Sequence, residues 1–294
     1  MNRYQFDWVD AVTLKPFGGN GCAVFYGAQD ISTQDRMALV RETKLTECAF
    51  LVGSDKADFG VRYYLHDREI LMAGHPTIAT VRSLIHRGLI DISDGIVSLT
   101  LEVGFGVLPI DITIEKGEPL ITMTQQQPAF GALADLQEVA AVVGLHADDI
   151  VGTPQVVSTG TEFCICILKS RSALERAELD RLRLIELQKR SGMKGIELFL
   201  AVLEGADVGD TYARLLLAPP NPAEDPFTGS ATGCLAAYLW ANGLIKSPIF
   251  TAEQGHGMGR PGQAKVEVLG ARENISGIKV AGHGVILMEG SLLL

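Results

Sequence analysis

An internal repeat is the feature of this sequence that most restricts its fold. With an offset of 155 residues, the segment 74–90 aligns with the segment 229–245 without a gap. Each segment has a helical pattern and leads into a strand that ends in a glycine pair, LEVGFG at 101–106 and AEQGHG at 252–257. The identical positions are Gly74/Gly229, Thr77/Thr232, Leu84/Leu239, Gly88/Gly243, Leu89/Leu244 and Ile90/Ile245. The repeat predicts an ancient duplication that produced two similar domains facing each other.

Strand and helix patterns are mixed along the whole chain, which predicts an α+β fold. Helices are expected over 32–45, from His75 onward, and over 132–145, 172–190 and 234–243. The segment 172–190 combines Leu174, Leu182, Leu184 and Leu187 with many Arg and Glu residues, so we expect one helix with a solvated outer face. A loop is expected over 219–233. Strands are expected over 4–9, 22–26, 48–52, 61–65, 97–103, 107–114, 120–125, 154–158, 163–168, 196–203, 213–218, 265–269, 277–282 and 285–289.

Charge and composition favour a small-molecule partner. The 294 residues carry 25 Lys and Arg against 35 Asp and Glu, a net charge of −10. This balance argues against binding to nucleic acid and to anionic membranes. No apolar run approaches a membrane span, and Asp7 and Asp10 interrupt the region where a secretory signal would be apolar. The odd number of five cysteines fits a reducing compartment, so a cytoplasmic location is expected.

The repeated helix starts predict an anion site. If the two halves face each other, two helix N-termini point toward one cleft, where backbone N–H groups and the helix dipoles attract a carboxylate. Gly74 and Gly229 allow the backbone to approach a ligand closely, and Ser230 and Thr232 add hydroxyl donors. The alternative is that the glycines are simple turn residues and that Ser230 only caps its helix.

Three side chains are candidate acids or bases. Glu47 stands at the entry to an apolar strand, a setting that favours proton transfer if the carboxylate is dehydrated. The alternative is a strand-edge glutamate that faces water. His75 is either functional or a capping or core histidine. Asp225 is either functional or a turn residue that accepts backbone N–H bonds.

Motifs for common cofactors are absent from the sequence. The glycines at 255–259 lack the spacing of a dinucleotide-binding loop, and no phosphate-binding loop or GxSxG motif occurs. Cys164 and Cys166 share one face of a strand but have no second pair to complete a zinc set, so they are expected in the core. We therefore expect neither a cofactor nor a metal.

Five motifs in order carry a resemblance to a known family. They are PFGGNGCAVFY (16–26), KLTECAFL (44–51), LMAGHPT (71–77), EDPFTGSATG (224–233) and VAGHGVIL (280–287). Together they resemble the phenazine-biosynthesis PhzF-like isomerases, and the resemblance covers essentially the whole chain. It implies a fold of the diaminopimelate-epimerase type, in which a curved mixed sheet wraps around a central helix in each of two pseudo-symmetric domains. The expected domains are 1–117 with 282–294, and 118–281, with the active site in the cleft between them and a homodimeric assembly.

The resemblance also implies a chemistry. It is cofactor-free movement of a proton on a small cyclic or conjugated carboxylic acid, with Glu47 at the position of the catalytic glutamate. His75 and Asp225 match the polar pair that holds the substrate. Asn20, Gly74, Gly229 and Ser230 match positions around the substrate carboxylate. The family's Gly-Asn-Pro is here Gly19-Asn20-Gly21, and its Thr-Pro is here Leu65-His66, so the substrate stays open.

Two other functions compete with the isomerase. The first is a protein that binds a small carboxylate without any chemistry. The second is an amino-acid racemase or epimerase, in which one cysteine from each half serves one face of the substrate. The matching positions here hold no cysteine, although Cys22, Cys48 and Cys234 lie near the motifs. Two-thiol racemisation is therefore disfavoured.

Overall fold

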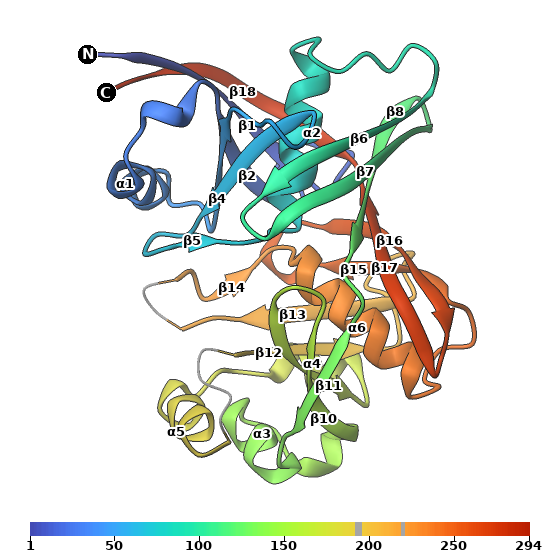
Figure 1. The fold of residues 1–294 in the computed structure, drawn as a ribbon. Helices are drawn as coiled ribbons and strands as arrows, with labels where there is room; N and C mark the ends of the chain where they lie inside the picture. The colour runs from blue at the N-terminus through green and yellow to red at the C-terminus, as the bar shows by residue number, and fades with distance from the viewer. Residues whose placement is uncertain (192–195, 219–220) are drawn as a thin grey trace. The chain divides into compact units, whose positions relative to one another are not determined.

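The computed structural model describes residues 1–191, 196–218 and 221–294. They divide into two compact units, one formed by residues 1–124 with 280–294 and the other by residues 125–279. Figure 1 shows that each unit is built from strands with a small number of helices. The mixture of helices and strands expected from the sequence is therefore confirmed.

The first unit is a mixed sheet with two α-helices. Its elements are β1 (Arg3–Ala11), β2 (Asn20–Phe25), α1 (Thr33–Thr43), β3 (Cys48–Val52), β4 (Phe59–Tyr64), β5 (Glu69–Ile70), α2 (His75–His86), β6 (Ile96–Val103), β7 (Gly106–Glu115), β8 (Glu118–Gln125) and β18 (Gly284–Leu293). Strand β1 pairs antiparallel with β18 and β2, and β2 pairs parallel with β3. Strand β4 pairs antiparallel with β3 and parallel with β6, which pairs antiparallel with β7.

The second unit repeats this order of pairings. Its elements are β9 (Ala129–Leu133), α3 (Leu136–Val142), β10 (Ile150–Ser158), β11 (Glu162–Leu168), α4 (Arg171–Arg176), α5 (Arg181–Ser191), β12 (Glu197–Val202), β13 (Thr211–Leu216), β14 (Glu224–Asp225), α6 (Gly229–Ala241), β15 (Ile249–Gln254), β16 (Gly262–Ala271) and β17 (Asn274–Gly282). Strand β10 pairs antiparallel with β9 and β11, and β11 pairs parallel with β12. Strand β13 pairs antiparallel with β12 and parallel with β15, which pairs antiparallel with β16.

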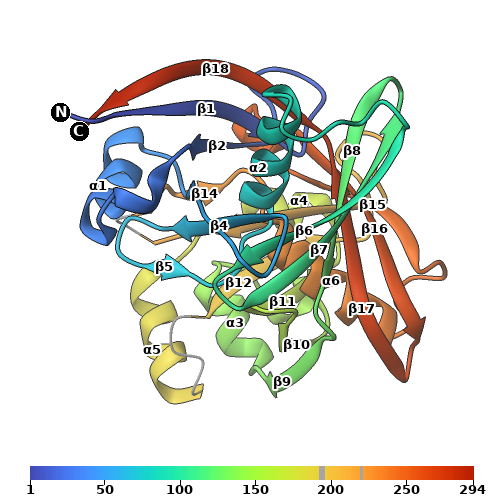
Figure 2. The same ribbon diagram turned by 45° about the horizontal axis from the view of Figure 1, so that its top comes forward.

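Each unit contains one helix that is buried on all sides. Nine of the twelve residues of α2 are buried, and so are eleven of the thirteen residues of α6. Helix α2 packs against β1, β2, β3 and β18, and Figure 2 shows it beside β1 and β2. A helix that is buried around most of its circumference needs neighbouring elements on several sides. The strands that pack against α2 and α6 supply these surroundings.

An aromatic cluster holds the other face of the first sheet against α1. Phe25 stacks on Phe50 with ring centroids 5.0 Å apart, and Tyr64 meets Phe50 edge-on at 5.5 Å. Val40 of α1 and Cys48 belong to the same buried cluster. Strands β2 and β3 are therefore packed on both faces, and the loop between α1 and β3 is held firmly at its two ends.

The charged segment 172–190 differs from the expectation of a single solvated helix. It forms two helices, α4 and α5, because Ala177 is extended and Asp180 starts a new helix by accepting the N–H groups of Leu182 and Arg183. Three of its leucines are buried in the second unit's core, namely Leu174, Leu184 and Leu187, whereas Leu182 is 74% exposed. The sequence analysis did not recognise this narrow apolar face because charged residues are abundant in the segment.

Two other boundaries differ from the sequence prediction. Helix α3 begins at Leu136 instead of near 132, because Asp135 caps it by accepting the Glu138 N–H and the preceding residues form β9. Helix α6 begins at Gly229, five residues before the predicted 234 and one residue before the position that matches the start of α2 in the repeat. The predicted loop 219–233 therefore ends early, and its first two residues lie outside the described ranges.

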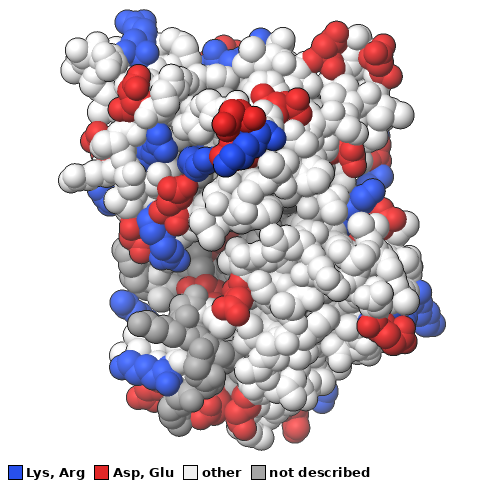
Figure 3. All heavy atoms as spheres, viewed as in Figure 1, with Lys and Arg blue, Asp and Glu red and all other residues white. Residues whose placement is uncertain are grey.

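Surface charge is mixed on the face that Figure 3 displays. Acidic and basic side chains are interspersed there with large uncharged areas, and no continuous basic surface is seen. Among the described residues, no helix combines the length and apolarity that crossing a membrane requires.

Candidate active site

Glu47 occupies a short loop between α1 and β3. Helix α1 starts at its cap Ser32, whose Oγ accepts the Asp35 N–H at 3.1 Å, and ends at Lys44, whose φ is 58°. Glu47 then directly precedes β3, which runs parallel to β2 with Cys48 opposite Ala23. The residue is half-buried, and its Oε2 atom is shielded from solvent. This oxygen does not face water, contrary to the strand-edge alternative.

Three buried side chains near the Glu47 carboxylate have raised pKa values. Burial raises the pKa of the Cys22 thiol well above its usual value, and the charges of Cys48 and Glu47 raise it further. Burial, with a smaller contribution from Glu47, raises the pKa of Cys48 to about 12. The pKa of Tyr63 is raised by burial and, to a smaller extent, by Cys22 and Glu47. Cys22, Cys48 and Tyr63 therefore lie near the Glu47 carboxylate, and their raised pKa values keep all three protonated at neutral pH.

His75 begins α2 and contacts Asn20 of β2. The side chain is only 3% exposed, and its Nδ1 lies 3.1 Å from the Asn20 Nδ2. An amide nitrogen only donates, so Nδ1 accepts the hydrogen bond, and the proton of the neutral ring sits on Nε2. The pair therefore fixes the tautomer in which Nε2–H is a donor. His75 is a buried histidine whose ring orientation is set by a second polar residue.

The turn before α2 is held by a chain of hydroxyl groups. The Tyr63 hydroxyl and Thr77 Oγ1 are 2.8 Å apart, and Thr77 Oγ1 donates to the Ala73 carbonyl at 2.7 Å. The Thr77 N–H also bonds to the Gly74 carbonyl at 3.1 Å. These contacts fix the backbone of Gly74, the cap of α2.

Gly19 is what allows Asn20 to reach its place. Its φ is +52°, and a Cβ atom there would lie 1.9 Å from the Ala11 carbonyl oxygen, so no other residue fits. Asn20 follows at once as the first residue of β2, opposite Ala11. The close approach of the two strands thus brings the amide side chain to the N-terminus of α2.

The second group of predicted residues lies at the start of α6. Asp225 is buried, and its Oδ2 accepts a hydrogen bond from Thr228 Oγ1 at 2.5 Å. Gln254 ties this turn together, because its Nε2 donates to the Asp225 carbonyl at 2.8 Å and its Oε1 accepts the Thr228 N–H at 3.0 Å. Asp225 is thus built into a rigid turn with its carboxylate held by a hydroxyl group.

Gly229 and Ser230 form the first turn of α6 and are also buried. Gln125 donates to the Gly229 carbonyl at 2.9 Å and accepts from Thr159 Oγ1 at 2.7 Å. Thr232 Oγ1 donates to the Thr228 carbonyl at 2.9 Å. This bond repeats, at the matching position, the one from Thr77 to Ala73. The first N–H groups of an α-helix lack intrahelical acceptors, so both turns present donors suited to a carboxylate.

The structure thus gathers the predicted residues into two groups. Asn20 and His75 are in direct contact in the first unit, where Glu47 and Gly74 also lie, and Asp225 belongs with Gly229 and Ser230 in the second. Sequence reasoning missed the residues that hold these groups in place, which are Tyr63, Thr77, Gln125, Thr228 and Gln254. Thr77 was signalled by its identity with Thr232 in the repeat. The other four carry no local signal.

The three cysteines near the motifs are poor nucleophiles. Cys22, Cys48 and Cys234 are all fully buried and free. Burial raises the pKa of Cys234 to about 11, and the other two thiols are shifted as described above. The thiolate is the reactive form of cysteine, and a raised pKa suppresses it at neutral pH. This chemistry argues against the thiol-dependent racemase.

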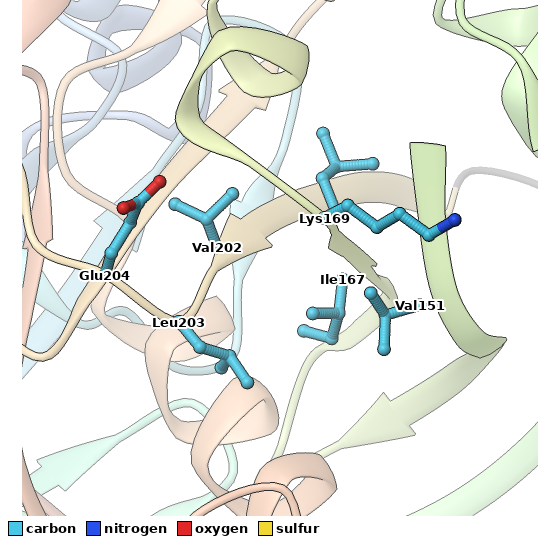
Figure 4. Close-up of a pocket in the computed structure, with 7 residues that line it drawn as sticks. Val151, Ile167, Lys169, Val202, Leu203 and Glu204 are labelled. Carbon is cyan, nitrogen blue, oxygen red and sulfur yellow. The ribbon is translucent and has the colours of Figure 1, made fainter. Parts of the chain in front are cut away.

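Two surface pockets in the second unit lie away from these residues. A pocket of about 210 Å³ is lined by Val151, Ile167, Leu168, Lys169, Val202, Leu203 and Glu204. Figure 4 shows its aliphatic side chains between Lys169 and Glu204. Another, of about 400 Å³, lies between α3 and α5. Within the described ranges, no group of three or more His, Cys, Asp or Glu side chains is arranged to hold a metal ion.

Comparison with known proteins indicates the class of enzyme to which this protein belongs. An uncharacterized isomerase of Clostridium acetobutylicum is 27% identical over 308 residues, covering 100% of this chain and 99% of its own length. The trans-2,3-dihydro-3-hydroxyanthranilate isomerase of Pseudomonas aeruginosa is 28% identical over 298 residues, covering 100% of both. A crystal structure of the Bacillus anthracis PhzF-family phenazine biosynthesis protein matches with a TM-score of 0.88 and 26% identity over 100% of both chains. The protein is an enzyme of the isomerase class.

The family of this protein is shown by a family model that matches most of the chain. The model of the family described as phenazine biosynthesis-like protein matches residues 9–290. This match spans nearly the whole sequence, so the chain belongs to the PhzF family. The resemblance inferred from the five motifs is therefore confirmed.

Proposed function

We propose that this protein moves a proton on a small cyclic or conjugated carboxylic acid, with Glu47 as general base and then general acid. The observation that carries the proposal is the half-buried carboxylate of Glu47, which has one oxygen shielded from water and lies close enough to the buried Cys22 and Cys48 to raise the pKa of both thiols. The Pseudomonas aeruginosa relative is named for isomerisation of trans-2,3-dihydro-3-hydroxyanthranilate, a molecule of this chemical class.

In the proposed reaction, one proton leaves the substrate and one proton returns to it. Glu47 removes a proton from a ring carbon, and the electron pair of the broken C–H bond is delocalised over the conjugated acid. The protonated Glu47 then returns the proton to another carbon of the same system, so that one double bond is shifted. The reaction needs neither an oxidant nor a cofactor. One carboxylate serves both steps if it reaches both carbon atoms.

The other predicted residues bind the charge that develops on the substrate. His75 donates from Nε2–H, in the tautomer that Asn20 sets by its 3.1 Å contact with Nδ1. The helix-start turns at Gly74 and Gly229, together with Ser230, supply donors for the substrate carboxylate, and Asp225 orients a polar group of the ligand. The proposal requires residues of both units to act on one substrate molecule.

The proposal extends to the assembly and location of the protein. A homodimer in the cytoplasm fits the family relationship and the acidic, cysteine-containing chain. A small carboxylate is its only proposed partner.

Glu47→Gln tests the role of the carboxylate. The amide keeps the shape of the side chain but cannot accept a proton, so turnover should fall by at least about 100-fold while folding and ligand affinity are retained. The assay is incubation with trans-2,3-dihydro-3-hydroxyanthranilate and a panel of cyclic unsaturated acids in deuterated water, with carbon-bound deuterium measured by NMR. Glu42→Gln on the exposed part of α1 is the matched control.

The same assay separates the competing function. A protein that only binds carboxylates would exchange no carbon-bound hydrogen with any acid that it binds. Exchange that persists at the wild-type rate in Glu47→Gln would remove Glu47 from the mechanism.

A further inference from the structure

Backbone strain is concentrated in the loop that leads into Asn20. Among the described residues, four other than glycine have a positive φ, and two of them, Val12 at 64° and Phe17 at 66°, lie in the loop 12–19. A β-branched or aromatic residue pays a steric cost for this conformation, which native structures retain where the surroundings enforce it. The surroundings of the loop 12–19 therefore hold it in a conformation that carries a steric cost.

A buried carboxylate enforces the conformation at Phe17. Asp10 lies in β1, is completely buried, and is fixed on both sides by pairing with Gly21 of β2 and Val285 of β18. Its Oδ2 accepts the Phe17 N–H at 2.7 Å. A charge-assisted bond of this kind from a rigid strand is strong enough to hold a strained residue. Asp10 thus decides where Phe17 is presented.

The strained conformation of Phe17 leaves its aromatic ring exposed to solvent. Its side chain is 67% exposed, although aromatic residues are normally covered. Asn20, only three residues further on, contacts His75 at 3.1 Å. Three residues span at most about 11 Å of chain, so the backbone of Phe17 lies within that distance of Asn20, the residue that contacts His75. The loop base is tied down as well, because the Val12 N–H bonds to the His283 carbonyl at 2.7 Å.

The geometry points to Phe17 as a substrate-contacting residue that selects for a ring, with Asp10 as the residue that positions it. The inference rests on the proposed function, because it assumes a cyclic carboxylic acid beside His75. It deepens that function by assigning ring selectivity to an apolar surface that a conjugated ring can stack on. Polar groups of the site bind the carboxylate, and Phe17 binds the flat face of the molecule.

Calorimetric titration with 3-hydroxyanthranilate tests the contact. This aromatic analogue offers the ring and the carboxylate but no proton to shift. Loss of one ring contact should raise its Kd about tenfold in Phe17→Ala. Phe130→Ala is the matched control, because Phe130 is a 42% exposed phenylalanine of the second unit, and its Kd should not change. An unchanged Kd in Phe17→Ala, or a change of oligomeric state without loss of affinity, would overturn the contact.

Phe17→Gly separates binding from folding. Glycine adopts a positive φ without steric cost, so this variant should unfold at the same or a higher urea concentration than the wild type while its Kd rises as in Phe17→Ala. A residue with a merely structural role would show the opposite, a loss of stability with affinity unchanged.

A double-mutant cycle tests the positioning role. Asp10→Ala should raise the Kd in the wild-type background and add little in the Phe17→Ala background, because it acts through Phe17. Asp10→Asn keeps an acceptor oxygen and replaces Asp10→Ala if that variant does not fold, with a smaller increase expected. Full additivity of the two losses would remove Asp10 from this role.

A failure of the Phe17 contact can be distinguished from a failure of the proposed function. If Glu47→Gln keeps exchanging protons, the proposed mechanism falls, yet the affinity loss in Phe17→Ala still stands. If Glu47→Gln is inactive and Phe17→Ala binds normally, only the ring contact falls. If the wild type does not bind 3-hydroxyanthranilate, the ring contact and the proposed substrate class fall together.

Discussion

At the scale of single residues, the candidate site depends on neighbours that set the state of each functional group. Asn20 decides which nitrogen of His75 carries the proton, and Thr228 binds the carboxylate of Asp225. Glu47 has its Oε2 shielded while the residue stays half-buried. The sequence predicts the candidate acids and bases from their motifs. It does not reveal the partners, because Asn20 and His75 are 55 positions apart.

The buried thiols give a prediction at this scale. Their pKa values are raised, to about 12 for Cys48 and about 11 for Cys234, so the thiols stay protonated at pH 8 and become reactive only as the pH approaches those values. We expect native protein treated with iodoacetamide at pH 8 to keep its activity and its mass. In denaturant, all five cysteines should be alkylated, which mass spectrometry shows directly.

Rapid inactivation of native protein at pH 8 would contradict this prediction. It would also favour the thiol-dependent racemase over the carboxylate-dependent isomerase.

At the scale of elements, α2 and α6 share their ends as well as their burial. Gly88 and Gly243 follow these helices with φ values of 68° and 67°. The N–H of the next residue bonds to the fifth residue before it at 2.9 Å in both cases, Leu89 to Leu84 and Leu244 to Leu239. This geometry is the glycine-terminated end that stops a helix. Identical residues of the repeat thus perform the same structural task twice, in support of a duplication.

Matched glycine substitutions test this equivalence. Alanine at position 88 or 243 must adopt a left-handed conformation, so each variant should lower the free energy of unfolding by about 1 kcal/mol. A Cβ atom has open space at Gly88 and an ordinary contact of 3.4 Å with Arg272 at Gly243, so neither variant adds a severe clash. Urea unfolding of Gly88→Ala, Gly243→Ala and the wild type gives the comparison. A cost confined to one of the two sites would argue against equivalent helix ends.

At the scale of the whole molecule, the same order of strand pairings occurs in both units, and the proposed residues are divided between them. Glu47 and His75 belong to the first unit and Asp225 to the second. The pseudo-symmetric relation of the units and the cleft between them stay predictions. Their functional consequence is that neither unit alone should catalyse the reaction.

A combined variant tests whether both units serve one reaction. Asp225→Asn should lower kcat/KM on the order of 100-fold, because misplacing the substrate removes the alignment that catalysis needs. The double variant Glu47→Gln/Asp225→Asn should be no slower than Glu47→Gln, since residues acting in one step are not additive. The readout is deuterium incorporation under identical conditions for the single and double variants. Losses that multiply would show that the two residues act independently.

The sequence by itself determined the family, the mixed fold and the repeat, because motifs and hydrophobic periods are local properties of the chain, and the site residues that it predicts stay a prediction. It failed at 172–190, where abundant charges concealed the buried Leu174, Leu184 and Leu187. Only the tertiary structure decided the tautomer of His75, the partial burial of Glu47 and the forced exposure of Phe17. Each of these depends on atoms brought together from distant strands, whose pairing and burial no local pattern encodes.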